Sequence, residues 1–83
     1  MTSVRVLHQG RFFFVQADEV TLGHTYKIPR LFFRSRWGAS ASVVSDDFKG
    51  FVDLGADRGE FRNKAEAIRA ILAYHGVGDP RYA

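Results

Sequence analysis

The sequence contains no cysteine, and long apolar runs are missing as well. Without thiols, disulfide scaffolds, thiolate zinc sites, iron–sulfur clusters and cysteine nucleophiles are excluded. Uninterrupted apolar runs, such as residues 12–15, are far shorter than the roughly 20 residues that span a bilayer. No apolar stretch of the signal-peptide type follows the first methionine. We therefore expect a cytoplasmic protein that does not cross a membrane.

The sequence motifs of common enzyme classes are also missing. The string Gly38–Ser42 lacks the second glycine of a nucleophile elbow, and no phosphate-binding loop or dinucleotide motif is present. The histidines His8, His24 and His75 lack the close spacing of metal ligands. The acidic residues between 46 and 60 do not follow the pattern of a calcium-binding loop. We therefore predict a protein that is not an enzyme, with no cofactor and no metal site.

The composition that remains is typical of one small folded domain. Hydrophobic residues make up 46%, charged residues 25% and aromatic residues 14% of the 83 residues, which argues against disorder. The net charge is +3, but residues 1–44 carry six cations and two acids, whereas residues 45–83 carry six cations and seven acids. Most of the cations are arginine, whose planar guanidinium pairs with phosphates and carboxylates. This favours a polyanionic or acidic partner, although a GC-rich genome would also raise the arginine content.

The N-terminal part predicts a β-hairpin. Residues 3–8 and 11–16 are rich in β-branched and aromatic side chains, and Gly10 lies at the break between them. Side chains alternate along a strand, so Phe12 and Phe14 share one face of the second strand, while its remaining apolar side chains share the other. A strand that is apolar on both faces should be central in its sheet or covered twice.

The middle of the chain allows two structures. Residues 17–23 predict a loop or a single helical turn that ends at Gly23. Residues 29–37 fit either a strand or a helix that begins at Pro29, but a helix would scatter the hydrophobic side chains over a wide arc. We prefer the strand, which separates the side chains into two faces. One face would carry Arg30, Phe32, Arg34 and Arg36, and the other Leu31, Phe33, Ser35 and Trp37.

The C-terminal half predicts two short strands and a helix. Residues 39–45 and 51–54 are strand-like, with polar turns after each. Residues 64–75 predict a helix, because Asn63 can cap its start and Glu66 follows at the capping-box position. The side chains that recur at helical spacing are Ile68, Ile71, Leu72 and His75.

The end of this helix is marked in the sequence too. Gly76 can adopt the left-handed conformation that follows a helix, and Val77 can fold back on Leu72 in a Schellman motif. Pro80 prevents the helix from resuming. For His75 we expect a structural role near the negative end of the helix dipole. Residues 78–83 should form a loose tail.

These elements predict one α+β domain spanning residues 1–83. We expect an antiparallel sheet of four to five strands with one C-terminal helix packed on one face. The residues predicted to form most of the core are Phe12, Phe14, Leu31, Phe33, Trp37, Val43, Val52, Phe61, Ile68, Ile71 and Leu72.

The candidate site is the basic and aromatic strand face before Gly38. Guanidiniums that alternate with an aromatic ring on an extended segment can bind phosphates while the ring stacks on a base. The alternative is an ordinary exposed strand face whose arginines keep a sheet edge soluble. The candidate binding residues are Arg30, Phe32, Arg34, Arg36, Trp37 and Phe13.

The stretch from Trp37 to Gly76 resembles a family of small DNA-binding domains. Its order of strand, loop, strand, turn and helix, with Phe61-Arg62-Asn63-Lys64-Ala65-Glu66-Ala67 opening the helix, is similar to phage and transposon integrase arms and plant Apetala-type factors. In that family a three-stranded antiparallel sheet packs on one helix and enters the major groove. The match covers about half of the chain, and about thirty further N-terminal residues with their own hairpin set this chain apart.

The chain also resembles, by type alone, small phage-encoded inhibitors such as anti-CRISPR proteins. These are compact, free of cysteine and rich in aromatic residues, and they act by covering a surface of a bacterial complex. Such a mechanism needs only aromatic and arginine anchors inside a polar rim. In this chain the anchors would be Phe13, Phe32 or Trp37.

Two functions follow as hypotheses. The first is a non-enzymatic module that binds nucleic acid or a nucleoprotein complex, in a phage or mobile-element setting. The second is a protein–protein inhibitor that blocks a bacterial protein complex. Binding through phosphates should weaken steeply with salt, whereas a hydrophobic interface should not. The protein would be a monomer or a homodimer with no membrane partner.

Overall fold

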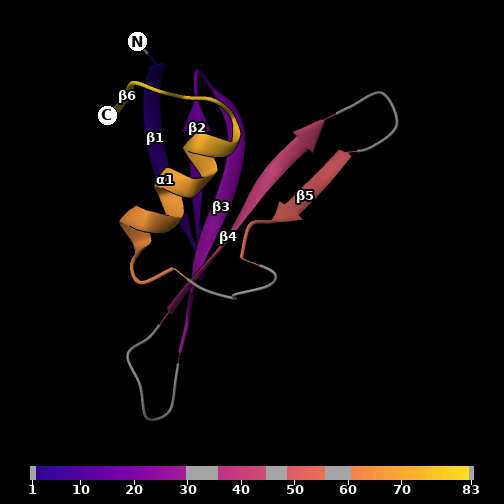
Figure 1. Ribbon diagram of the computed structural model, residues 1–83, viewed down its shortest axis with the longest axis vertical. Helices are drawn as coiled ribbons and strands as arrows, with labels where there is room; N and C mark the ends of the chain where they lie inside the picture. The colour runs from indigo at the N-terminus through magenta and orange to yellow at the C-terminus, as the bar shows by residue number, and fades with distance from the viewer. Residues whose placement is uncertain (1, 30–35, 45–48, 56–60, 83) are drawn as a thin grey trace.

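The computed structural model describes residues 2–29, 36–44, 49–55 and 61–82. Within these ranges the chain forms a six-stranded sheet and one helix, which confirms the α+β class but adds strands to the expected four or five (Figure 1). In chain order the elements are β1 Thr2–Gln9, β2 Phe12–Ala17, β3 Val20–Ile28, β4 Arg36–Val44, β5 Lys49–Asp53, α1 Lys64–Tyr74 and β6 Pro80–Tyr82. The strand order across the sheet is β5-β4-β3-β2-β1-β6, and every pair is antiparallel except β1 with β6.

Two tight turns build the N-terminal meander. β1 and β2 form the predicted hairpin, and Gly10 at its first loop position has a φ of 62°, as a type II′ turn requires. β2 is central, since it pairs with β1 on one side and β3 on the other. The turn from β2 to β3 has positive φ at both loop residues, 49° at Asp18 and 69° at Glu19, the pattern of a type I′ turn.

The β2–β3 turn holds Glu19 in a strained backbone conformation, and the resulting loss of stability can be measured. Glu19 holds a left-handed backbone conformation that glycine adopts without strain, and Asp-Gly is a favoured type I′ sequence. We expect Glu19→Gly to raise the free energy of unfolding by about 0.5–1 kcal/mol. Urea denaturation of the two proteins measures this difference. A variant of equal or lower stability would contradict the strain assigned to Glu19.

The segment at residues 17–23 differs from its predicted loop or helical turn. It forms the β2–β3 turn and the first part of β3, which continues through Gly23 to Ile28. Gly23 does not end the element, because it lies inside the sheet where a side chain has no room: a Cβ there would overlap the Ser40 carbonyl oxygen. The register of β2 against β3 shifts beside Gly23, with the irregularity between Val15 and Gln16.

The helix begins at the predicted residue and ends at Tyr74, one residue before the predicted end, and its predicted caps are confirmed. Asn63 accepts a hydrogen bond from the Glu66 N–H at 2.9 Å, and Glu66 reaches back to the Arg62 N–H at 3.0 Å. At the other end Gly76 has a φ of 72°, and the Val77 N–H donates to the Leu72 carbonyl at 2.9 Å. These are the bonds of a capped N-terminus and a Schellman C-terminus, so the local sequence decides where the helix begins and ends.

His75 has the structural role expected for it, with a more specific partner. It is the C-cap residue of α1, and its Nε2 lies 2.8 Å from the Leu22 carbonyl oxygen of β3. A hydrogen bond of this kind needs the tautomer in which Nε2 carries the proton. The bond ties the end of the helix to the sheet where the β2–β3 register shifts.

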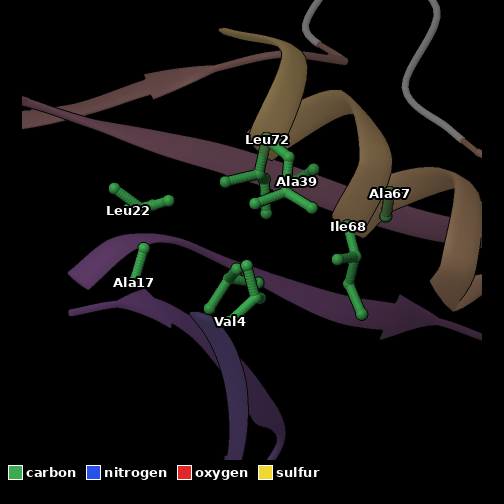
Figure 2. Packing of buried hydrophobic residues seen from close by; sticks show 9 residues of the cluster. Val4, Ala17, Leu22, Ala39, Ala67, Ile68 and Leu72 are labelled. Carbon is green, nitrogen blue, oxygen red and sulfur yellow. The ribbon is translucent and has the colours of Figure 1, made fainter. Parts of the chain in front are cut away.

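The core lies between α1 and one face of the sheet. In Figure 2, side chains of the sheet such as Val4, Leu22 and Ala39 point toward Ile68 and Leu72 of the helix. Among the described residues the buried cluster consists of Val4, Val15, Ala17, Leu22, Ala39, Ala67, Ile68, Ile71 and Leu72, with Val6, Trp37, Leu54, Phe61 and Val77 partly buried against it. Burial of this apolar area supplies most of the driving force for folding.

The predicted core was correct for the helix and wrong for part of the sheet. Ile68, Ile71 and Leu72 are buried, and Trp37 and Phe61 pack partly buried against the cluster. Four residues expected in the core are absent from that cluster: Phe12, Phe14, Val43 and Val52. The alternation along β2 holds, but Val15 rather than the two phenylalanines faces the helix. Leu31 and Phe33 lie outside the described residues.

The C-terminal tail is a further correction. Instead of a loose segment, Pro80–Tyr82 form β6, which pairs in parallel with the start of β1. Pro80 stops the helix as predicted, but a proline can also begin an edge strand, where its missing N–H need not be paired. In the part of the chain that the structure describes, no helix is long and apolar enough to cross a membrane.

Candidate functional site

The strand register divides the side chains of the sheet into two unlike faces. Residues directly opposite in an antiparallel pair point to the same side. The helix-covered face is built from small residues where α1 approaches, namely Gly23, Thr25, Ala39 and Ala41. The other face, here called the open face, carries the large rings. Its aromatic residues are Phe12, Phe14, His24, Tyr26 and Phe51.

The rings of the open face form one contiguous cluster across three strands. Phe12 meets His24 edge to face, with ring centroids 5.2 Å apart, and meets Tyr26 in the same way at 5.9 Å. Phe14 lies 5.7 Å from His24, and Phe51 on β5 meets His24 at 4.7 Å. Four of these side chains are half-buried and Phe51 is 51% exposed. The cluster is therefore both mutually packed and accessible from one side.

His24 lies at the centre of this cluster. Its ring touches Phe12, Phe14, Tyr26 and Phe51, and its Nδ1 is buried without a hydrogen-bond partner among the described residues. Burial lowers the pKa of His24 below its ordinary value of 6.5, because the apolar rings solvate the imidazolium poorly. The open face thus presents a neutral imidazole among aromatic rings at neutral pH.

This lowered pKa predicts a pH-dependent stability. As the pH falls below 6.5, the unfolded chain takes up a proton at His24 before the folded protein does, so the free energy of unfolding decreases. Above pH 6.5 the neutral His24 makes its full contribution to the free energy of unfolding. This contribution is lost as the pH falls toward the pKa that His24 has in the folded protein. We expect His24→Phe to flatten this decrease between about pH 7.5 and pH 5.5 in urea denaturation. Equal pH dependence in the two proteins would contradict the effect.

Small residues of β4 make room for the rings. Gly38 pairs with Tyr26, and a Cβ at Gly38 would lie 2.5 Å from the Tyr26 ring. Ser40 pairs with His24, and Ser42 uses its hydroxyl to donate to the Thr21 carbonyl oxygen at 2.7 Å. The tyrosine ring therefore lies close over the backbone of β4, with hydroxyl groups beside the cluster.

The charge around the open face is positive. Arg5 and Arg36 are exposed and, by register, point to this side, and the Arg11 guanidinium lies 5.8 Å from the centre of the Phe12 ring. The strands β1, β2, β3 and β4 contain no aspartate or glutamate. Asp53, at the end of β5, is the acidic residue that the described strands place on this face. Arginines beside rings are suited to an anionic, planar ligand.

The structure separates the predicted site residues. Arg36 and Trp37 begin β4 and alternate, so Arg36 lies on the open face and Trp37 on the helix side. Phe13 also lies on the helix side, with its ring 5.7 Å from that of Trp37 and the Lys64 ammonium 4.4 Å above it. The other predicted residues, Arg30, Phe32 and Arg34, lie outside the described residues.

The sequence alone did not identify the aromatic residues of the open face as a group. Phe12 and Phe14 were assigned to the core, and His24 and Tyr26 fell in a segment without a predicted strand. The signal was present as a repeated spacing of two, Phe12 with Phe14 and His24 with Tyr26. Two adjacent strands with this spacing place four rings on one face, provided that their register is known.

In the ranges described, no three histidine, aspartate or glutamate side chains gather in a way that could hold an ion. The aromatic and arginine surface is the candidate site because its rings are contiguous and accessible from one side. Comparison of the chain with protein-family models, with curated proteins and with solved structures found no match.

Proposed function

We propose that this domain binds nucleic acid, free or within a nucleoprotein complex, through the open face of its sheet. The observation that carries the proposal is the contiguous cluster of Phe12, Phe14, His24 and Tyr26 on the face opposite the helix. An aromatic ring can stack on any base, and a sheet displays such rings in a plane that unstacked bases can reach. The preferred ligand is single-stranded, because duplex bases are already stacked on one another.

The placement of the cations supports the same ligand. Arg5, Arg11 and Arg36 lie around the rings and can bind backbone phosphates while the bases stack. The four strands β1 to β4 carry no acids, so repulsion of a phosphate chain from this part of the sheet comes from the β2–β3 turn, where Asp18 and Glu19 line a pocket with Arg5. The proposed activity is binding alone.

The alternative hypothesis, a protein–protein inhibitor, has less support on this surface. Its predicted anchors Phe13 and Trp37 pack against each other on the helix side. The Phe13 ring is also stacked on His8 at 4.2 Å and covered by Lys64. These two rings lie on the face that carries the helix, and Lys64 of the helix lies over Phe13, which restricts the access of a partner to them.

Binding can be measured by fluorescence anisotropy with labelled oligothymidine and oligouridine of about ten nucleotides, within the site size of small sheet domains. We expect Tyr26→Ala to weaken binding by roughly 5- to 100-fold, the usual effect of losing one stacked base. Tyr74→Ala is the matched aromatic control, because Tyr74 is 48% exposed on the helix. Circular dichroism verifies that each variant is folded.

The cations offer a second matched pair. Arg36 and Lys27 are close in the β3–β4 ladder but point to opposite faces. We expect Arg36→Ala to weaken binding and Lys27→Ala to leave it unchanged. With three arginines on the ligand, affinity should fall with salt at a logarithmic slope of about −2. Absent binding at low salt, or equal losses in both variants of a pair, would refute the proposal. A salt-insensitive, stoichiometric protein complex would favour the inhibitor.

A further inference from the structure

β5 is the outer strand on one side of the sheet, and it exposes two apolar side chains. Among the described residues it pairs with β4 alone. Phe51 is 51% exposed on the open face and Val52 is 38% exposed on the other. The β4–β5 arm extends beyond the helix (Figure 1). Natural proteins usually protect such edges with charge, proline or a bulge.

The free backbone groups of β5 can be identified from the ladder. The Leu54 N–H donates to the Ala39 carbonyl at 2.9 Å, so at this position the backbone points toward β4. In an antiparallel ladder the direction alternates from residue to residue. The N–H and C=O groups of Lys49, Phe51 and Asp53 therefore point away from β4, where a further strand can pair with them.

The sequence of β5 is complementary to itself. It reads Lys49-Gly50-Phe51-Val52-Asp53, with opposite charges at equal distances from the central phenylalanine. If two copies align antiparallel about Phe51, the lysine position of each chain lies opposite the aspartate position of the other. Gly50 then lies opposite Val52, which leaves space for the larger side chain, and the two Phe51 residues meet at the axis. Opposite charges and aromatic rings across a strand pair are stabilising.

We propose that two copies of this chain associate through antiparallel pairing of β5 with β5, which joins their sheets into one. The interface is isologous, since the same strand contributes from both sides about a two-fold axis. Main-chain hydrogen bonds supply affinity, and the charge pattern sets the register. Because Phe51 contacts His24, the open faces of the two copies become continuous across the seam. The association itself does not depend on nucleic-acid binding.

Sedimentation equilibrium of the isolated protein without nucleic acid tests this proposal. We expect a monomer–dimer equilibrium for the natural sequence. In the dimer, position 49 of each copy lies opposite position 53 of the other, so this pair occurs twice. Lys49→Asp turns both pairs into aspartate facing aspartate, and Asp53→Lys turns both into lysine facing lysine. Each change should weaken dimerisation by about tenfold. A mixture of the two variants restores opposite charges at both positions, so it should form mixed dimers with nearly the original affinity.

Two further variants keep the test decisive. Asp53 also accepts a hydrogen bond from the Gly55 N–H at 2.8 Å, so Asp53→Lys could impair folding. Phe51→Pro removes an N–H that β4 does not use and should abolish the dimer in a folded protein. Arg81→Asp, on the opposite edge strand β6, is the control that should leave the dimer intact. A strictly monomeric natural protein, or dimers that persist in Phe51→Pro, would overturn the proposal, whether or not the open face binds nucleic acid.

Discussion

Replacing Gly23 by alanine is expected to destabilise the domain by about 3 kcal/mol, the upper range for overpacking a well-filled interior. Gly23 lies in β3 directly beneath the helix. A Cβ at this position would overlap the Ser40 carbonyl oxygen and lie 3.0 Å from the Ile71 Cγ2 and 3.1 Å from the Ala41 Cα. Two of these atoms belong to the backbone of β4, which cannot move without breaking the β3–β4 ladder. The helix or the strand pair must therefore shift.

Gly38 provides the matched control for this substitution. A Cβ at Gly38 would also meet atoms at 2.5–2.7 Å, but all of them belong to the Tyr26 side chain on the open face. A side chain can rotate away, so we expect Gly38→Ala to cost only about 1 kcal/mol. Urea denaturation of both variants gives the comparison. If both variants lost the same free energy of unfolding, the close approach of β4 and the helix to Gly23 would not explain the destabilisation expected for Gly23→Ala.

Truncation of Ile71 should have an effect of similar or larger size. Its side chain is fully buried between the helix and the sheet, beside Gly23. We expect Ile71→Ala to lower the free energy of unfolding by about 2–5 kcal/mol, because it removes buried apolar surface and leaves a cavity. For a domain of this length that is a large share of a total of roughly 5–10 kcal/mol. Thermal and urea denaturation should both detect it.

Arg69→Ala tests whether the effect belongs to the buried face of the helix. Arg69 is exposed on the same helix, two positions before Ile71. Alanine is a good helix former, so this substitution should change stability by no more than about 0.5 kcal/mol. If both variants lost stability equally, the packing of α1 on the sheet would not be the main contribution of the helix.

The two largest expected stability effects, at Gly23 and Ile71, both arise from the close packing of the helix on one face of the sheet. The same arrangement leaves the candidate site on the other face. Small residues under the helix, such as Gly23 and Ala39, let α1 approach the sheet closely. The large rings of Phe12, Phe14 and Tyr26 are left on the side that the helix does not cover. Large hydrophobic side chains on the open face are less buried than they would be beneath the helix. Exposed apolar surface of this kind is typical of a binding site.

Local features of the fold were predictable because a few adjacent residues determine them. The β1–β2 hairpin follows from Gly10 between two strand-like runs, and the helix follows from the Asn63 cap and the Schellman sequence at Gly76. The bonds that cap the helix join residues no more than five positions apart, and the hairpin turns between Gln9 and Phe12, three positions apart. Propensity and capping then act without help from the rest of the chain.

The errors all involve contacts between distant parts of the chain. Gly23 was taken for a breaker, because the sequence does not show that Ser40 and Ile71 would approach it. The tail was expected to be loose, because nothing near Pro80 indicates that β1 lies beside it. Phe12 and Phe14 were assigned to the core on their size alone. Which face of a strand is buried depends on the partner strands and on where the helix packs.

By itself, the sequence determined the α+β class, the alternation of side chains along β2 and the limits of the helix, because periodicity and capping are properties of neighbouring residues. It also predicted a binding surface of arginine and aromatic side chains on a strand, and Arg36 is part of the candidate site. Only the tertiary structure decided which rings gather there, because His24, Tyr26 and Phe51 join Phe12 through strand pairings set by long-range register. The physical reason is that a two-residue repeat defines two faces of a strand, and only packing chooses which of them meets the helix.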